Sequence, residues 1–366
     1  TKMNEIIFIQ LNEINFDLAK KYLANDAEYR FANLRKLIDE FSSIDTFAEK
    51  KYENLEPWVQ WVSIQTGKPF KEHQVFRLGD IVKHKNLPQI FEKIEKNGYS
   101  VGAISPMNTD NRLNCPAYFI PDPWTDTLPD TSSFSKRLTS MLRQAVNDNA
   151  KGSLTLVSIF TLFESAIRTF QIKRTAYLIK LVFSAIKYPW KKSLVLDYLI
   201  HLIHLKLFKS KKPNFSSVFF NAGAHIQHTY FFNSKYLNTK LNNPSWYIDN
   251  DADPFDDMLT VYDSIIGDYL DMSNKGVGVI IATGLQQIPY DFIKYYYRLS
   301  NHGNFLESIG VKFKKVSPRM TRDFEIIFHK REDLEESYDI IKSVKSVKDN
   351  IDIFGEIEIR DKSLFV

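Results

Sequence analysis

Two histidines, His225 and His228, lie three residues apart just after an apolar run of strand length. The small residues that separate them from this run let the main chain bend closely around a ligand. Neutral imidazole binds zinc or manganese, and a nearby carboxylate such as Glu13 would complete the ligand set. The pattern predicts a metal-binding or catalytic site. Two histidines hydrogen-bonded in a polar core are the alternative, and the sequence leaves both open.

A second group of candidate residues lies in residues 52–67, which bring together carboxylates, tryptophans and an amide before a Thr-Gly turn. Such a density of aromatic and polar side chains is typical of a pocket lining. Glu56 is the candidate general base or metal ligand. Trp58, Gln60 and Trp61 are candidate substrate-binding residues. The alternative is that both tryptophans are core anchors and the glutamates are solvated.

Further polar residues follow along the chain and suit an anionic substrate group. His73, Arg77 and Asp80 supply cations and a carboxylate near a glycine, and Arg77 is suited to hold an anion. A plain surface salt bridge is the competing interpretation. Asn108 directly follows a predicted strand and is a candidate wall of the site.

The elements that must position these residues are predicted from nearly continuous apolar runs at residues 5–11, 99–105, 216–221 and 277–282. Runs of this kind are typical of strands buried on both faces of a parallel sheet. Helical spacing at 88–97 and 254–272 alternates with them, which predicts an α/β fold. Because such sheets build their sites at the carboxyl ends of strands, Glu13 and His225 are expected at one edge.

The expected organisation has four parts: a core at 1–133, a basic helical insertion or cap at 134–213, the rest of the core at 214–322, and a small α+β element at 323–366. Residues 173–212 contain many lysines and aromatic residues with Asp197 as their one acid. A basic helical surface of this kind suits peripheral contact with a membrane. A solvated lysine face is the alternative.

Composition narrows the class of protein. The 366 residues carry 48 basic and 44 acidic side chains, a balance that does not indicate nucleic acid as a partner. The single cysteine, Cys115, excludes an internal disulfide framework. The first residues do not resemble a signal peptide, and no uninterrupted apolar run reaches spanning length. We therefore expect a cytoplasmic protein, with membrane association through 173–212 as an addition.

The order of these segments resembles the alkaline phosphatase and sulfatase superfamily, which includes nucleotide phosphodiesterases. Leu11-Asn12-Glu13 is similar to its first strand ending in a metal-binding acid, and Ser63 to Gly67 to the stretch after its nucleophile. Asn221 to His225 resembles its Asp-x-x-Gly-His metal motif. The resemblance covers roughly residues 4–125 and 214–305. It implies an alkaline-phosphatase-like sheet sandwiched by helices.

The departures from that family pattern concern the reactive residues themselves. Glu56 or Pro57 stands where the family has its nucleophile, Asn221 replaces an aspartate, and residues 283–286 replace a Ser-Asp-His-Gly motif. His302 corresponds to a late metal-binding histidine. The resemblance implies at most one zinc, manganese or calcium ion, held by Glu13, His225, His228 and His302, or a metal-free site.

The function expected from these patterns is that of a hydrolase or transferase acting on an anionic ester or a sugar-linked small molecule or glycan, in cell-surface polysaccharide metabolism. The alternative is a non-catalytic binding protein that holds an acidic glycan or a lipid headgroup in the same place. Turnover of a substrate would separate the two.

Overall fold

The structure is a computed structural model that describes residues 5–147, 156–293, 297–318, 322–348 and 350–366. The chain divides into two compact units. The first comprises residues 1–143 and 155–293, and the second comprises residues 144–154 and 294–366.

The first unit is built on a sheet of five parallel strands, which confirms the predicted α/β class. Its strands are β1 (Ile6–Leu11), β2 (Val101–Ile104), β3 (Tyr118–Ile120), β4 (Phe215–Phe220) and β5 (Gly278–Ala282). The order across the sheet is β3-β2-β4-β1-β5. The four predicted apolar runs all form strands, and β3 is an addition to them.

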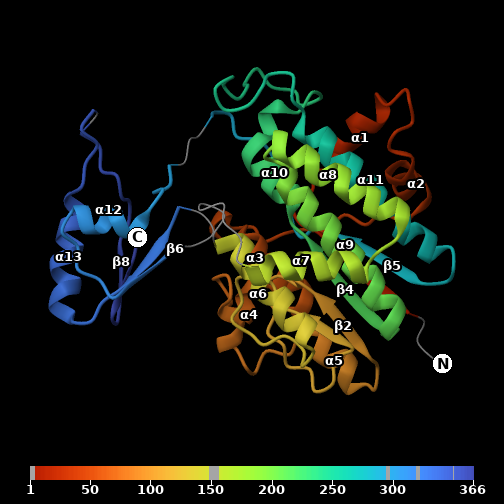
Figure 1. Cartoon of the computed structure of the whole chain (residues 1–366), viewed down its shortest axis with the longest axis horizontal. Coiled ribbons are helices and arrows are strands. Elements are labelled where there is room, and N and C mark those ends of the chain that lie inside the picture. Colours follow the sequence, from red (N-terminus) through yellow and green to blue (C-terminus); the bar gives the residue numbers. More distant parts are fainter. Residues whose placement is uncertain (1–4, 148–155, 294–296, 319–321, 349) are drawn as a thin grey trace. The chain divides into compact units, whose positions relative to one another are not determined.

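Helices cover both faces of this sheet (Figure 1). They are α1 (Phe16–Ala24), α2 (Ala32–Glu40), α3 (Pro57–Thr66), α4 (Phe70–His73), α5 (Ile90–Lys96), α6 (Ser133–Asn147), α7 (Leu156–Arg168), α8 (Ile172–Lys187), α9 (Lys191–Lys211), α10 (Ala222–Tyr230) and α11 (Pro254–Ser273). Three short 3-10 turns are η1 (Tyr52–Asn54), η2 (Asp80–Lys83) and η3 (Phe231–Asn233).

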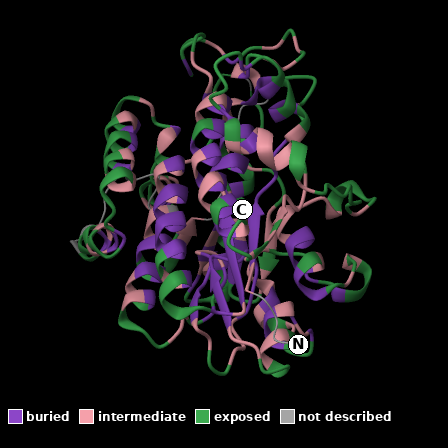
Figure 2. Ribbon diagram, turned by 90° about the vertical axis from the view of Figure 1, so that its right-hand side faces the viewer, coloured by how far each residue is buried: buried purple, intermediate pink, exposed green. Residues whose placement is uncertain are grey.

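Alternate residues of each strand enter two different cores, as the two-residue period of a strand requires. In β1, Ile7 and Ile9 join the core under α9 and α11, whereas Phe8 joins the core that contains Trp61 and Phe91 of α3 and α5. Both faces of β1 are therefore apolar, and β1 to β4 form the buried centre of the unit, whereas the edge strand β5 is partly exposed (Figure 2). This burial explains why the strand sequences read as continuous apolar runs.

The predicted insertion is helical, and its parts have different surroundings. Its last helix, α9, packs directly on β2 and β4 and is buried along most of its length. Helix α8 packs along α9 and keeps an exposed side. In the described part of the chain, no helix has the length and apolar character needed to cross a membrane.

The second unit is a small α+β structure of four antiparallel strands, as predicted for the C-terminal region. The strands lie in the order β6-β7-β9-β8. Its elements are α12 (His302–Ser308), β6 (Lys315–Pro318), β7 (Phe324–Ile327), α13 (Arg331–Ser343), β8 (Glu358–Arg360) and β9 (Ser363–Phe365). The unit begins before residue 323, because α12 and β6 share its core with β7 and α13.

Candidate functional site

The strand order places a topological switch point at the carboxyl ends of β1 and β4. These two strands are neighbours, but β1 leads to β2 on the far side of β4, and β4 leads to β5 on the far side of β1. Their connections therefore leave in opposite directions. In open α/β sheets, ligands bind in the crevice that such a divergence opens.

Glu13 lies at this point, two residues beyond β1, in a left-handed backbone conformation with φ of 60°. Its neighbours hold this conformation from several directions. Its N–H donates to the carbonyl of Thr283 at 2.9 Å, and its own carbonyl accepts from Nε2 of Gln227 at 2.9 Å. A non-glycine residue in this region is strained, and such strain concentrates at functional sites. The backbone thus fixes where the Glu13 carboxylate points.

The carboxylate of Glu13 is buried and meets the ring of His228 from α10. Its Oε2 lies 2.9 Å from Nε2 of His228, whose side chain is 59 % exposed while that of Glu13 is 2 % exposed. The amide nitrogen of Gln287 donates to the same carboxylate oxygen and lies 2.8 Å from the same ring nitrogen. A buried carboxylate that holds an exposed imidazole is the arrangement that orients a histidine for proton transfer.

His228 and Glu56 at this edge both have raised pKa values. Burial acts against the charged ring of His228, but its hydrogen bond to Glu13 and the charges of Glu13 and Glu56 outweigh burial and raise its pKa. Burial and the charge of Glu13 raise the pKa of Glu56, against the opposing effect of His228. Such displaced values in neighbouring groups are typical of acid–base sites.

His225, the other predicted histidine, shares the exposed side of α10 with His228 because residues three apart lie on one helix face. The residue is exposed, but surrounding protein atoms partly desolvate its ring. This desolvation and, to a smaller extent, the charge of His228 lower the pKa of His225. His225 is therefore neutral where His228 is charged. The two rings are suited to different tasks.

Helix α10 is held in place by Asp197 of α9, a residue that the sequence analysis did not select. Its carboxylate accepts hydrogen bonds from the N–H groups of Asn221 and Ala222 at 3.2 and 2.8 Å. It also accepts from the Tyr262 hydroxyl at 2.8 Å. These contacts satisfy free N–H groups at the start of the helix. Burial raises the pKa of Asp197 to about 7, although the three hydrogen bonds favour the charged form.

The small residues before His225, where the sequence analysis expected the main chain to bend around a ligand, thus lie in the first turn of helix α10. The Asp197 carboxylate makes the start of this helix favourable from 25 residues earlier in the chain. Its signal in the sequence was its isolation as the one acid among residues 173–212. Gln227 and Gln287, which contact Glu13 from two directions, carried no comparable signal.

A chain of buried hydrogen bonds ties the ends of β1 and β4 to α3. Trp61 donates its indole N–H to Oδ1 of Asn12 at 2.7 Å, and Asn12 donates through Nδ2 to Oδ1 of Asn221 at 2.8 Å. Trp61 is fully buried. Although Trp61 was predicted to bind substrate, it lies in the core and holds Asn12 in place. For this residue the structure agrees with the alternative that the tryptophans are core anchors.

Gln60 and His73 also have partners within the protein. Nε2 of Gln60 donates to the carbonyl of Asn54 at 2.7 Å. His73 is buried, with Nε2 3.0 Å from the Ser63 hydroxyl and Nδ1 accepting from the N–H of Val75 at 3.0 Å. Burial lowers the pKa of His73 to about 4. The ring is therefore neutral near pH 7 and joins α3 to α4.

Trp58, Arg77, Asp80 and Asn108 meet around the loop before η2. The side chain of Asn108 is fully buried, accepts from the N–H of Gly79 at 2.9 Å and donates to the carbonyls of Trp58 and Arg77. The Trp58 indole donates to the carbonyl of Phe76 at 2.9 Å. Asp80 pairs with Lys83 at 2.7 Å, and the Arg77 side chain is exposed. Asn108 thus positions the loop that carries Arg77.

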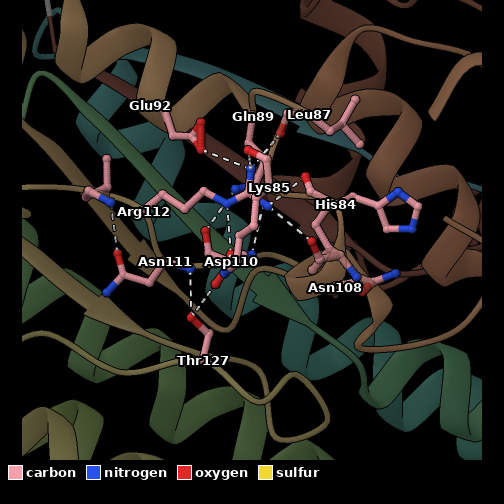
Figure 3. Close-up of polar contacts among 12 residues, drawn as sticks. His84, Lys85, Leu87, Gln89, Glu92, Asn108, Asp110, Asn111, Arg112 and Thr127 are labelled. Carbon is pink, nitrogen blue, oxygen red and sulfur yellow. Dashed lines mark hydrogen bonds and ion pairs between the residues drawn. The ribbon is translucent and has the colours of Figure 1, made fainter. Parts of the chain in front are cut away.

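A polar network that the sequence analysis missed continues from Asn108 (Figure 3). The guanidinium of Arg112 donates to the carbonyls of Ile81, His84 and Leu87 at 3.1, 3.1 and 2.8 Å and pairs with Asp110 at 2.8 Å. Burial disfavours the charged Asp110 carboxylate, but hydrogen bonds from Lys85, Arg112 and Thr127 outweigh it and lower its pKa. Because these groups satisfy one another, the network supports the loop structurally.

The four predicted metal ligands are divided between the two units. Glu13 and His228 touch each other, whereas His302 belongs to the second unit, where its ring packs edge-on against Phe324. Across the described residues, no three His, Cys, Asp or Glu side chains are grouped so that they could hold a metal ion.

A scan against protein-family models and a search of curated proteins find no match to this chain. The resemblance to the alkaline phosphatase and sulfatase superfamily therefore stays a prediction that rests on the order of the segments. The structure shows the parallel sheet and, at its carboxyl edge, the contact between Glu13 and His228.

Proposed function

We propose that this chain is a hydrolase or transferase that acts by general acid–base catalysis on an anionic ester or sugar-linked substrate. The observation that carries the proposal is the contact between the buried Glu13 carboxylate and the exposed His228 ring at the switch point of the sheet. Glu56 adds a second carboxylate within electrostatic range of both groups. The resemblance to the sulfatase and phosphodiesterase superfamily supports the substrate class.

The pKa shifts favour one assignment of roles. A raised pKa keeps His228 in the imidazolium form toward neutral pH, so it is the general acid and also attracts an anionic substrate. The raised pKa of Glu56 makes its carboxylate a stronger base than an ordinary glutamate. Glu13 orients the imidazolium and stabilises its charge.

In the proposed reaction, the carboxylate of Glu56 takes a proton from water or from an acceptor hydroxyl. The oxygen of that nucleophile bonds to the phosphorus, sulfur or anomeric carbon of the substrate. The bond to the leaving-group oxygen breaks, its electron pair stays on that oxygen, and His228 gives its proton there. Glu56 stands where the superfamily has its nucleophile, which suits an attack by water or a hydroxyl. We assign no step to a metal ion.

The test uses the purified full chain with p-nitrophenyl esters of phosphate, phosphodiester and sulfate and with p-nitrophenyl glycosides. We expect turnover of one class, and a loss of at least about a hundredfold in kcat/KM in His228→Gln and in Glu56→Gln. His329→Gln is the matched control, because this exposed histidine belongs to the second unit. Equal rates in His228→Gln and wild type would refute the assignment. Binding without turnover would instead support a binding protein for an acidic glycan or lipid headgroup.

A further inference from the structure

Helix α7 buries its polar side and exposes its apolar side, the reverse of an ordinary amphipathic surface helix. Its buried side carries hydroxyl residues, Ser158, Thr161, Ser165 and, just past its end, Thr169. The last three hydroxyls donate to the carbonyls four residues earlier, at 2.7 to 2.8 Å. Its exposed side carries large apolar residues, Val157, Phe160, Phe163 and Ile167. A surface helix ordinarily places its apolar stripe toward the core.

The next helix, α8, is apolar on two opposite sides. One side packs on α9 through Leu178, Leu181 and Ala185. The other side carries an outward stripe in which residues recur every three or four positions, Ile172, Ala176, Ile179, Phe183 and Ile186. Phe183 is 68 % exposed and Ile186 is 76 % exposed. This regular outward stripe indicates a surface that meets an apolar partner.

A row of lysines runs beside the outward stripe of α8. Lys173, Lys180 and Lys187 are spaced seven residues apart, so they lie along one side of the helix, and all three are exposed. From residue 156 to residue 188 the sequence contains one acid, Glu164, whose carboxylate is paired with Arg137 and Arg168. Within residues 156–188, the charges beside the exposed apolar side chains of α7 and α8 are therefore positive apart from the paired Glu164.

A basic cavity lies where α7 turns into α8. It has a volume of about 250 Å³ and is lined by four cationic side chains, Arg168, Arg174, Lys206 and Lys209, beside the exposed Phe170. Arg168 pairs with Glu164, and Arg174 pairs with Asp268. Two further lysines thus face the same hollow as these paired arginines. Such a cavity suits the phosphate of a lipid headgroup next to an inserted aromatic ring.

We propose that the outer face of α7 and α8 binds the surface of an anionic phospholipid bilayer, with its apolar side chains at the boundary between headgroups and acyl chains. Both the apolar stripe and the lysine row fit this partner. The bilayer takes up the apolar stripe, and its negative surface attracts the lysine row. The proposed contact is made by α7 and α8. The buried helix α9, which makes up the second half of residues 173–212, takes no part in it.

A second copy of this chain is the other apolar partner that such a face suggests. Pairing two copies through this face would bring lysine rows of the same sign together without an exposed acid to compensate them. Like charges opposed across an interface cost several kcal/mol. Charge complementarity therefore favours the anionic bilayer over self-association.

Sedimentation with vesicles tests the proposal. We expect the full chain to bind vesicles of phosphatidylcholine mixed with phosphatidylglycerol at low salt, and to bind pure phosphatidylcholine vesicles much more weakly. The triple variant with Lys173, Lys180 and Lys187 changed to Gln should lose affinity by about fivefold per lysine, on the order of a hundredfold in total. Matched control changes to Gln at Lys50, Lys71 and Lys240, which are also exposed, should preserve most of the binding.

The apolar half of the proposal has its own variant, in which Ile179, Phe183 and Ile186 are changed to Ser. These side chains are exposed, so circular dichroism should show an intact fold, while vesicle binding should fall by at least about tenfold. Changing Ile44 and Phe47 to Ser, two exposed apolar residues elsewhere, is the control. Equal binding of both vesicle types, or unchanged binding in both triple variants, would overturn the proposal. Wild-type dimers that the Ser variant abolishes, without vesicle binding, would show that a second copy is the partner.

Discussion

Oε2 of Glu13 lies 2.9 Å from Nε2 of His228, although more than two hundred residues separate them in the chain. The sheet makes this contact, because β1 and β4 are hydrogen-bonded neighbours and both residues follow the ends of these strands. One partner is buried and the other is open to solvent. The pair is therefore anchored in the protein and accessible to a substrate from outside.

Glu13 should control the protonation of His228. In the wild type, His228 should titrate above the ordinary histidine pKa of 6.5, because its contact with Glu13 outweighs the effect of burial. Glu13→Gln removes the negative charge, so the pKa of His228 should fall. Proton–carbon NMR of the imidazole Cε1 group over a pH series measures this value. An unchanged midpoint in Glu13→Gln would show that the carboxylate does not set the charge of the ring.

His225 supplies a reciprocal measurement in the same NMR experiment. Its pKa is lowered by burial and, to a smaller extent, by the charge of His228. His228→Gln removes that charge, so the pKa of His225 should rise while remaining below 6.5, since burial persists. Circular dichroism of His228→Gln should match that of the wild type. An unchanged midpoint for His225 in the variant would show that the charge of His228 does not act on this ring.

The pH dependence of catalysis should be bell-shaped if the proposed roles are right. Activity should rise as Glu56 ionises, with a midpoint above its ordinary value of 4.5, and should fall as His228 loses its proton above 6.5. Glu13→Gln should move the alkaline limb to lower pH, because it lowers the pKa of His228. Glu56→Gln should abolish the acidic limb together with most of the rate. A profile of kcat/KM measured for the three proteins checks both limbs.

The parallel sheet could be predicted from the sequence because β1, β2 and β4 are buried on both faces. β1 and β4 therefore appear as apolar runs with polar residues at their carboxyl ends, and β5 is equally apolar although it is an edge strand and partly exposed. β3 was missed because it has three residues between two prolines, too few to show a period. The order of the strands depends on contacts between distant segments, so no local pattern in the sequence reveals it.

Part of the site could also be predicted, because its residues follow strands that are recognisable in the sequence. Glu13 and His228 could be selected because each follows an apolar strand, and the structure brings them into contact. The capping of α10 by Asp197 and the contact of Gln287 with Glu13 depend on chain segments that only the folded sheet brings together. Trp61 and Asn108 were selected as pocket residues by their type, but their hydrogen bonds within the core could not be read from the sequence.

Asp197 should make the protein less stable as the pH rises. Its pKa is about 7 in the folded state against an ordinary value of 3.8, so between these values the folded protein holds a proton that the unfolded chain has released. The stabilisation is fully present below 3.8 and is lost as the pH rises through about 7. From about pH 5 to about pH 8 this group should lower the free energy of unfolding by roughly 3 kcal/mol.

Asp197→Asn carries no titrating group, so it should remove this part of the pH dependence. Urea unfolding at about pH 5 and about pH 8 measures the change for each protein. Because Asp197 is protonated in the folded wild type at about pH 5, the neutral amide resembles it best there, and the two proteins should differ mainly in how far stability falls toward pH 8. Asp126→Asn is the control, since that side chain is fully exposed. The same pH slope in Asp197→Asn and wild type would contradict the assignment.

Arg112 should be required for stability in a way that a lysine cannot replace. Its planar guanidinium reaches the carbonyls of Ile81, His84 and Leu87 while it pairs with Asp110, and a single ammonium group cannot span these positions. Arg112→Lys should lower the free energy of unfolding by roughly 3 kcal/mol, since buried partners lose their donors. Hydrogen exchange should also become faster in residues 81–87. Arg331→Lys, at an exposed arginine that pairs with Glu335 on its own helix and donates to the carbonyl of Asp361, should change stability by less than about 0.5 kcal/mol. Equal losses in the two variants would mean that the buried carbonyl contacts of Arg112 contribute no more than this exposed one.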